Sequence, residues 1–138
     1  MAVAVVFDTN ILFSAAGWKG PPYRCVELAR SGRIQAIACW ETLSELTEKL
    51  SLKLHFSEEQ INDTLADLLS FHRLVPVAGS VSICRDVDDN IILENAVAGG
   101  AEFIITGDED LLILKIYQGV VILKAADFWN RWNSGAIF

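Results

Sequence analysis

Four carboxylates stand at places in the chain from which they could reach one pocket: Asp8, Glu45, Asp89 and Asp108. Asp8 and Asp108 each follow an apolar, strand-like run, and the other two lie in or beside helix-like segments between those runs. If the four converge to about 5 Å, each pair repels by roughly 3 kcal/mol at an effective dielectric near 20. No lysine or arginine close in sequence offers obvious neutralisation. The pattern therefore predicts a site for a divalent metal ion.

The elements that must position these acids follow from the hydrophobic pattern. Strands are predicted over residues 2–7, 34–38, 74–77, 102–106 and 120–123. Helices are predicted over residues 23–30 and 41–52, from a capping box that opens at Ser57, from Asp88 to Gly99-Gly100, and over residues 126–132. This alternation predicts a three-layer α/β/α fold with a central, mainly parallel sheet of about five strands. Ligands of such sheets collect beyond the carboxyl ends of the strands, where Asp8 and Asp108 stand.

Each acid also has a structural interpretation. Asp8 fits a polar strand-to-helix turn, and any acid near residue 108 fits a helix cap. In the acidic run 85–90 we assign the capping role to Asp88 and expect Asp89 to lean toward the core. A calcium-loop interpretation of that run fails, because Ile91 stands where the loop needs glycine. A common pocket explains the four acids together better than four separate caps.

Composition limits the class of protein. The chain has 138 residues, 52 % of them hydrophobic, and a mean hydropathy of +0.35, which predicts one packed domain over residues 1–138. No apolar run approaches the roughly 20 residues that span a bilayer, and no basic region precedes residues 2–7, so neither a membrane protein nor a signal peptide is expected. The net charge of −7 argues against nucleic-acid binding through a basic surface, with Lys49 and Lys53 taken as solvated charges. It leaves room for a nucleic-acid enzyme, because metal ions can supply positive charge.

The cysteines argue against zinc. Cys25, Cys39 and Cys84 are widely spaced, form no CxxC pair, and lie far in sequence from His55 and His72. Free buried thiols in a reducing cytoplasm are the expectation.

Four motifs in order resemble the PIN domain family: DTN after the first strand, an acid-bearing second helix, RDVDDN before a helix, and TGDEDLL after a strand. The resemblance runs from Val3 to about Phe128. It is greatest to small bacterial and archaeal VapC-like proteins, grouped as toxin components of toxin–antitoxin pairs. Two residues depart from that subgroup: Val87 replaces a usual proline, and Trp40 replaces a small polar residue before the second helix.

The resemblance implies a metal-dependent ribonuclease with an RNA substrate and a cognate antitoxin protein. Asp8, Glu45, Asp89 and Asp108 match the family's acidic quartet, while Asn10, Thr106 and Asp110 match positions that support the pocket or add a metal contact. Mg²⁺ or Mn²⁺ suits such oxygen ligands. We hypothesise that Asp8 anchors the main ion with Asp89 and Asp108, and that Glu45 binds a second ion or positions water. The number of ions stays open.

Three rival functions remain. A phosphotransfer enzyme with Asp8 as nucleophile would need a second aspartate where Asn10 stands, and a receiver-like domain would need an acidic pair at the first strand end. The third rival is a PIN-like module that binds RNA or protein without cleaving. A homodimer is also predicted, with contacts from Trp18, Trp129, Trp132 and residues 136–138, unless these side chains only cover the core.

Overall fold

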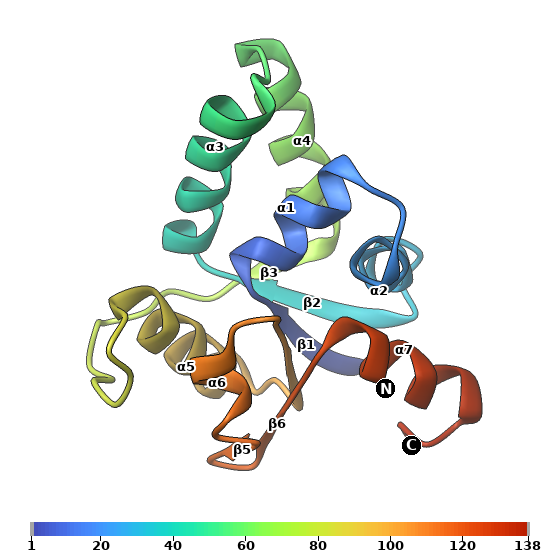
Figure 1. The fold of residues 1–138 in the computed structure, drawn as a ribbon, viewed down its shortest axis with the longest axis vertical. Helices are drawn as coiled ribbons and strands as arrows, with labels where there is room; N and C mark the ends of the chain where they lie inside the picture. The colour runs from blue at the N-terminus through green and yellow to red at the C-terminus, as the bar shows by residue number, and fades with distance from the viewer. Residues whose placement is uncertain (1, 138) are drawn as a thin grey trace.

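The protein is described here by a computed structural model of residues 2–137, which form a six-stranded sheet and seven helices (Figure 1). The strands are β1 (Val3–Phe7), β2 (Ile34–Ala38), β3 (His72–Leu74), β4 (Phe103–Ile105), β5 (Ile116–Tyr117) and β6 (Val120–Leu123). The helices are α1 (Thr9–Gly17), α2 (Pro21–Arg30), α3 (Trp40–Leu54), α4 (Glu58–Phe71), α5 (Val87–Gly99), α6 (Glu109–Leu112) and α7 (Ala125–Ser134). The strand order is β3-β2-β1-β4-β6-β5, and only the β5–β6 pairing is antiparallel.

The sheet is apolar on both faces because helices cover both. Val5 and Phe7 of β1 belong to a core under α1, α2, α3 and α7, whereas Val6 of the same strand belongs to a second core under α5. Figure 1 shows α1, α2 and α7 on one side of the strands and α5 with α6 on the other. The predicted α/β/α class with a mainly parallel sheet is therefore confirmed.

Most element predictions agree with the structure, and the differences have local causes. Strands β2 and β6 have the predicted bounds, but the third strand lies at residues 72–74, not 74–77. Its pairing ends as the Val75 N–H donates to the Ala38 carbonyl at 2.8 Å, and Pro76 has no N–H to continue the ladder. Helices α1 and α6 and strand β5 were not predicted. They are short, and apolar residues predominate in α1.

Helix caps confirm one prediction and correct another. Ser57 and Gln60 form the predicted capping box, with both reciprocal hydrogen bonds present. Asp88 was wrongly assigned as the cap of α5. Asp86 caps the helix instead, its Oδ1 accepting from the Asp88 N–H at 2.9 Å. The Asp88 carboxylate is thereby free to face the acidic pocket described below.

Polar side chains of α5 hold the long connection between β3 and α5. The Asn90 side chain binds the backbone of Cys84 with both its amide oxygen and its amide nitrogen, and Glu94 accepts from the backbone N–H groups of Ala78 and Ser80. On the inner side, Gly99 passes so close to the sheet that an added Cβ would lie 2.8 Å from Ile37 Cγ2. These contacts set the position of α5 and of the acids in its first turn.

The remaining predictions concern thiols and aromatic side chains. All three cysteines are free, as expected, but only Cys25 and Cys39 are buried, since Cys84 is half-buried. Of the predicted dimer contacts, Trp129 and Trp132 pack against the core, whereas Trp18 is 57 % exposed. Phe138 lies outside the described residues. The homodimer stays a prediction. Among residues 2–137, no helix is long and apolar enough to cross a membrane.

Candidate functional site

Asp8 lies at the point where the order of the strands in the sheet reverses. The chain passes from β1 to β2 and β3 on one side, then returns to place β4 on the other side of β1. Phe7 and Ile105 pair at the ends of β1 and β4, so Asp8 and Thr106 emerge side by side at the carboxyl edge. This is the switch point at which open α/β sheets bind ligands.

A chain of hydrogen bonds through Thr106 connects the two strand ends. The buried Thr106 hydroxyl donates to Asp8 Oδ2 at 2.7 Å and accepts from the Asp108 backbone N–H at 3.0 Å. Asp108 in turn caps α6, its Oδ1 accepting from the Asp110 N–H at 2.8 Å. Burial raises the pKa of Asp8, although the hydrogen bond from Thr106 partly offsets that effect. Thr106 therefore fixes the orientation of the Asp8 carboxylate.

Asp89 is the most electrostatically perturbed acid of the site. Its side chain is only 4 % exposed, and its Oδ2 has no hydrogen-bond partner among the described residues. Burial, followed by the charges of Asp108, Asp86 and Asp8, raises the pKa of Asp89 to about 7. A buried carboxylate oxygen without a partner is rare in folded proteins, and a bound cation would satisfy it.

Glu45 corrects the prediction that no basic residue neutralises the acids. Lys49, one helical turn further along α3, lies with its Nζ 3.1 Å from Glu45 Oε1 and donates to Asn10 Oδ1 at 2.8 Å. Burial nevertheless raises the pKa of Glu45, because Lys49 offsets it only in part and the charge of Asp88 adds to it. The i, i+4 spacing of Glu45 and Lys49 was the sequence feature that could have predicted this ion pair.

The structure brings all four predicted acids to one cavity of about 370 Å³. Its lining consists of Asp8, Asn10, Glu45, Glu48, Lys49, Leu52, Lys53, Asp86, Asp88, Asp89 and Asp108. Thr106 supports the cavity from below through Asp8. Asp110 has ligand atoms within 4.8 Å of those of Asp89 and Asp108, but both its oxygens also accept from Arg85 at 2.9 Å. Sequence reasoning did not assign six residues that line the cavity: Glu48, Lys49, Leu52, Lys53, Asp86 and Asp88.

This donor set fits a divalent cation with oxygen ligands. Carboxylates predominate, no cysteine or histidine lines the cavity, and Asp89 Oδ2 is buried without a partner among the described residues. Mg²⁺ and Mn²⁺ prefer such ligands, whereas Zn²⁺ sites are usually built with nitrogen or sulfur.

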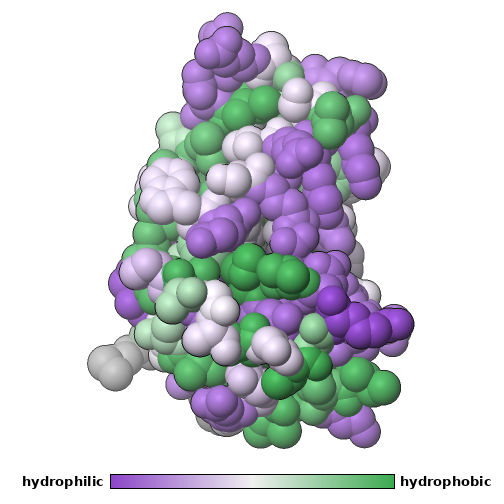
Figure 2. All heavy atoms as spheres, turned by 90° about the vertical axis from the view of Figure 1, so that its left-hand side faces the viewer, coloured by the Kyte–Doolittle hydropathy of each residue, from purple (hydrophilic) through white to green (hydrophobic). Residues whose placement is uncertain are grey.

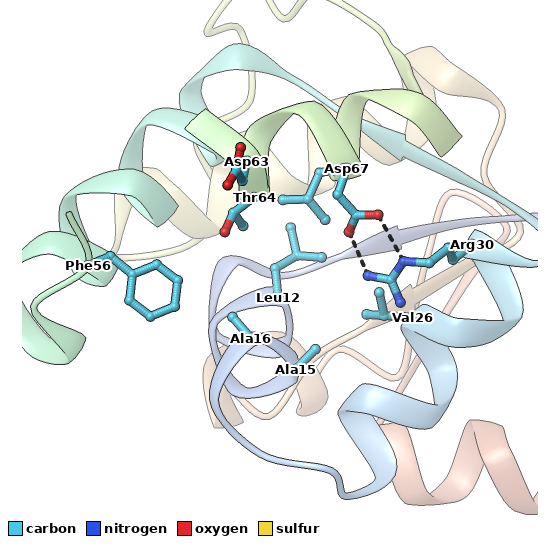
Figure 3. Close-up of a pocket in the computed structure, with 10 residues that line it drawn as sticks. Leu12, Ala15, Ala16, Val26, Arg30, Phe56, Asp63, Thr64 and Asp67 are labelled. Atoms are coloured by element: carbon cyan, nitrogen blue, oxygen red, sulfur yellow. Dashed lines mark hydrogen bonds and ion pairs between the residues drawn. The ribbon is translucent and has the colours of Figure 1, made fainter. Parts of the chain in front are cut away.

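A second hollow, of about 350 Å³, has a different character. It lies between α1, α2 and α4, where Leu12, Ala15 and Val26 give it an apolar floor (Figure 3). At one side Arg30 joins α2 to α4 through two hydrogen bonds to Asp67, at 3.0 and 2.7 Å. Asp63 and Asp67 also line it, but Asp67 is paired with Arg30 and the floor is apolar, so this groove offers surface for apolar side chains rather than a metal site.

Comparison with known proteins assigns the family. The PIN domain family model matches residues 4–110, so the chain belongs to the PIN domain family, and the resemblance seen in the motifs is confirmed. No curated protein matches the chain in sequence.

Solved structures share the fold. VapBC2 from Rickettsia felis, crystallised with a DNA fragment from its promoter, has 17 % identity and a TM-score of 0.59 over 87 % of this chain and 97 % of its own. FitAcB from Neisseria gonorrhoeae has 15 % identity and a TM-score of 0.58 over 88 % and 98 %. The PIN domain endonuclease Utp24 has 17 % identity and a TM-score of 0.53 over 86 % and 82 %.

Because burial and neighbouring acids disfavour the charge of Asp89, removing that charge is predicted to stabilise the folded state. Because its pKa is higher in the folded chain than in the unfolded one, the native state loses stability as pH rises toward and through about 7. In metal-free protein at pH 8, we expect Asp89→Asn to raise stability by roughly 1–2 kcal/mol, several °C in Tm, and the gain to shrink at pH 5. Thermal unfolding in EDTA measures it. Asp63→Asn, at an exposed acid of α4, is the matched control, and a Tm lowered by Asp89→Asn at pH 8 would contradict the prediction.

Proposed function

We propose that this protein is a metal-dependent ribonuclease that hydrolyses RNA phosphodiester bonds and acts as the toxin of a toxin–antitoxin pair. One observation supports the nuclease proposal most strongly: acids from four separate parts of the chain surround one cavity, and a buried oxygen of Asp89 is left without a partner among the described residues. Membership of the PIN domain family and the fold shared with the endonuclease Utp24 agree with it.

Asp8, Asp89 and Asp108 would hold the principal Mg²⁺ or Mn²⁺ ion, with Asp110 as a further ligand if Arg85 releases it. When bound, such an ion neutralises charge on the scissile phosphate and makes water a better nucleophile. Thr106 keeps Asp8 in one orientation through its hydroxyl. The acids alone would repel a phosphate, so the proposal requires the cation before substrate binds.

Glu45 would position the attacking water or bind a second ion. Glu45 lines the cavity, and its carboxylate pairs with Lys49, which also donates to the Asn10 side chain. A carboxylate whose pKa is raised by burial is suited to accept a proton from water, since it is a stronger base than an ordinary glutamate. Asn10 and Lys49 therefore act as positioning residues for Glu45.

The toxin proposal includes a protein partner. VapBC2 and FitAcB, which are toxin–antitoxin complexes, share this fold. The chain offers the apolar groove between α1, α2 and α4 (Figure 3). We propose that an antitoxin covers this groove with apolar side chains, while residues 1–138 function as one domain. The three unpaired thiols agree with a reducing, cytoplasmic location.

RNA cleavage tests the nuclease proposal. Purified protein with Mn²⁺ or Mg²⁺ is expected to cleave a mixed labelled RNA pool, and EDTA is expected to abolish cleavage. Asp8→Asn should lower the rate by about 100-fold or more, because it removes a ligand that serves the transition state. Asp63→Asn should leave the rate unchanged. RNA binding without cleavage in any metal would favour the non-catalytic module instead.

Growth of the host tests the toxin proposal separately. Induced expression of the wild-type chain is expected to arrest growth, and expression of Asp8→Asn at the same level is not, because arrest depends on the acidic site. Growth arrest by both chains would show that the toxicity does not depend on RNA cleavage. Normal growth with an active enzyme would contradict the toxin role.

A further inference from the structure

Another groove, separate from the one between α1, α2 and α4, lies beside the acidic cavity along α3. It has a volume of about 500 Å³ and is lined by Cys39, Trp40, Glu41, Ser44, Leu74, Val75, Pro76 and Val77. One wall is the first turn of α3, and the other is the extended segment after β3. Figure 2 looks from the left of Figure 1 onto the side of the molecule where α3 and α5 lie, and hydrophobic surface there directly adjoins hydrophilic surface.

Trp40 gives the groove a large aromatic surface. Its side chain is 57 % exposed although it opens a helix whose opposite face, including Leu43 and Leu46, is fully buried. An indole this exposed does not serve the core. It also gives the helix no cap, since α3 begins at Cys39 without a side-chain capping bond. Neither packing nor capping accounts for tryptophan at this position.

The facing wall is rigid and apolar. The Val75 N–H donates to the Ala38 carbonyl at 2.8 Å, and Asn95 Nδ2 donates to the Val75 carbonyl at 3.0 Å. Pro76 adds a residue with no N–H and a fixed φ. The backbone at Val75 is thus already satisfied, and the wall presents mainly side-chain carbon to whatever enters the groove.

The groove and the acidic cavity are adjacent along α3. Glu41 lines the groove and Glu45 lines the cavity, and the same holds for Ser44 and Glu48. Each of these pairs has i, i+4 spacing, so its members are neighbours on the helix surface, about 6 Å apart along the axis. A ligand with a phosphate in the cavity therefore has its adjoining group within reach of the groove.

The charge of the groove selects what that adjoining group can be. Its lining residues include one carboxylate, Glu41, one hydroxyl, Ser44, and no basic side chain. A phosphate would be repelled, whereas a planar uncharged nucleobase would stack on the indole. The amino groups on the edges of adenine, cytosine and guanine could donate to the Glu41 carboxylate.

We propose that this groove, which we call the Trp40 groove, binds the base of the nucleotide beside the scissile phosphate in single-stranded RNA. The inference rests on the proposed nuclease function and adds a base-binding site to it. A base in a continuous duplex cannot enter, because it is stacked between its neighbours. Single-stranded segments are therefore the substrate, and a base with an amino group is preferred at the stacked position.

Two apolar residues of similar exposure provide a matched test. Ile116, 58 % exposed, belongs to β5, at the opposite edge of the sheet from β3 and the Trp40 groove. Trp40→Ala should lower kcat/KM for single-stranded RNA by about 10- to 100-fold through a higher KM, while Trp40→Phe keeps most of the activity and Ile116→Ala all of it. Circular dichroism confirms that each variant is folded. An eight-nucleotide RNA with 5-iodocytidine, whose base carries an amino group, should cross-link to Trp40, as mass spectrometry of the peptides would show.

The outcomes separate the groove from the nuclease function. Cleavage with an unchanged KM in Trp40→Ala, and no cross-link at residue 40, would overturn the groove and leave the nuclease intact. A cross-link at Trp40 in a chain that never cleaves would support the groove and overturn the nuclease. Neither cleavage nor cross-linking would overturn both.

Discussion

The mutual repulsion of carboxylates at the carboxyl edge of the sheet is the constraint on which the site depends. Asp8, Asp89 and Asp108 come from three different elements, and each is fixed by contacts outside the acids themselves. The β1–β4 pairing sets Asp8 and Thr106 side by side, and the capping of α6 places Asp108. The core packing of the sheet and helices keeps the acids together against a repulsion that grows as water is excluded.

The second part of that constraint is the position of α5. Asn90, Glu94 and Asn95 all use their side chains to hold the segment between β3 and α5, and Gly99 lets the helix approach Ile37. The same contacts serve two neighbouring sites. They aim Asp89 into the acidic cavity, and through Val75 they stiffen the wall that faces Trp40. The same contacts of α5 therefore position both the acidic cavity and the Trp40 groove.

The sequence predicted the parts of this design that depend on local pattern. Apolar runs marked β1, β2 and β6, and acids just beyond strand ends marked the pocket, because parallel strands end at one edge. It did not predict which acid of residues 86–89 caps α5, since either Asp86 or Asp88 fits the cap and only backbone geometry decides. The contact between Asn10 and Lys49, 39 residues apart, likewise depends on how α1 packs on α3. The groove beside Trp40 needs the path of residues 74–77, which the strand prediction misplaced.

The central claim is that the acidic cavity binds a divalent cation, and crystals soaked in Mn²⁺ would test it most directly. Anomalous scattering locates manganese without any assumption about activity. The account predicts an anomalous peak bounded by the carboxylates of Asp8, Asp89 and Asp108, at the roughly 2 Å ligand distances of small divalent ions, and no such peak in Asp8→Asn crystals. Manganese bound only elsewhere, or a cavity that stays free of it at saturating concentration, would contradict the account.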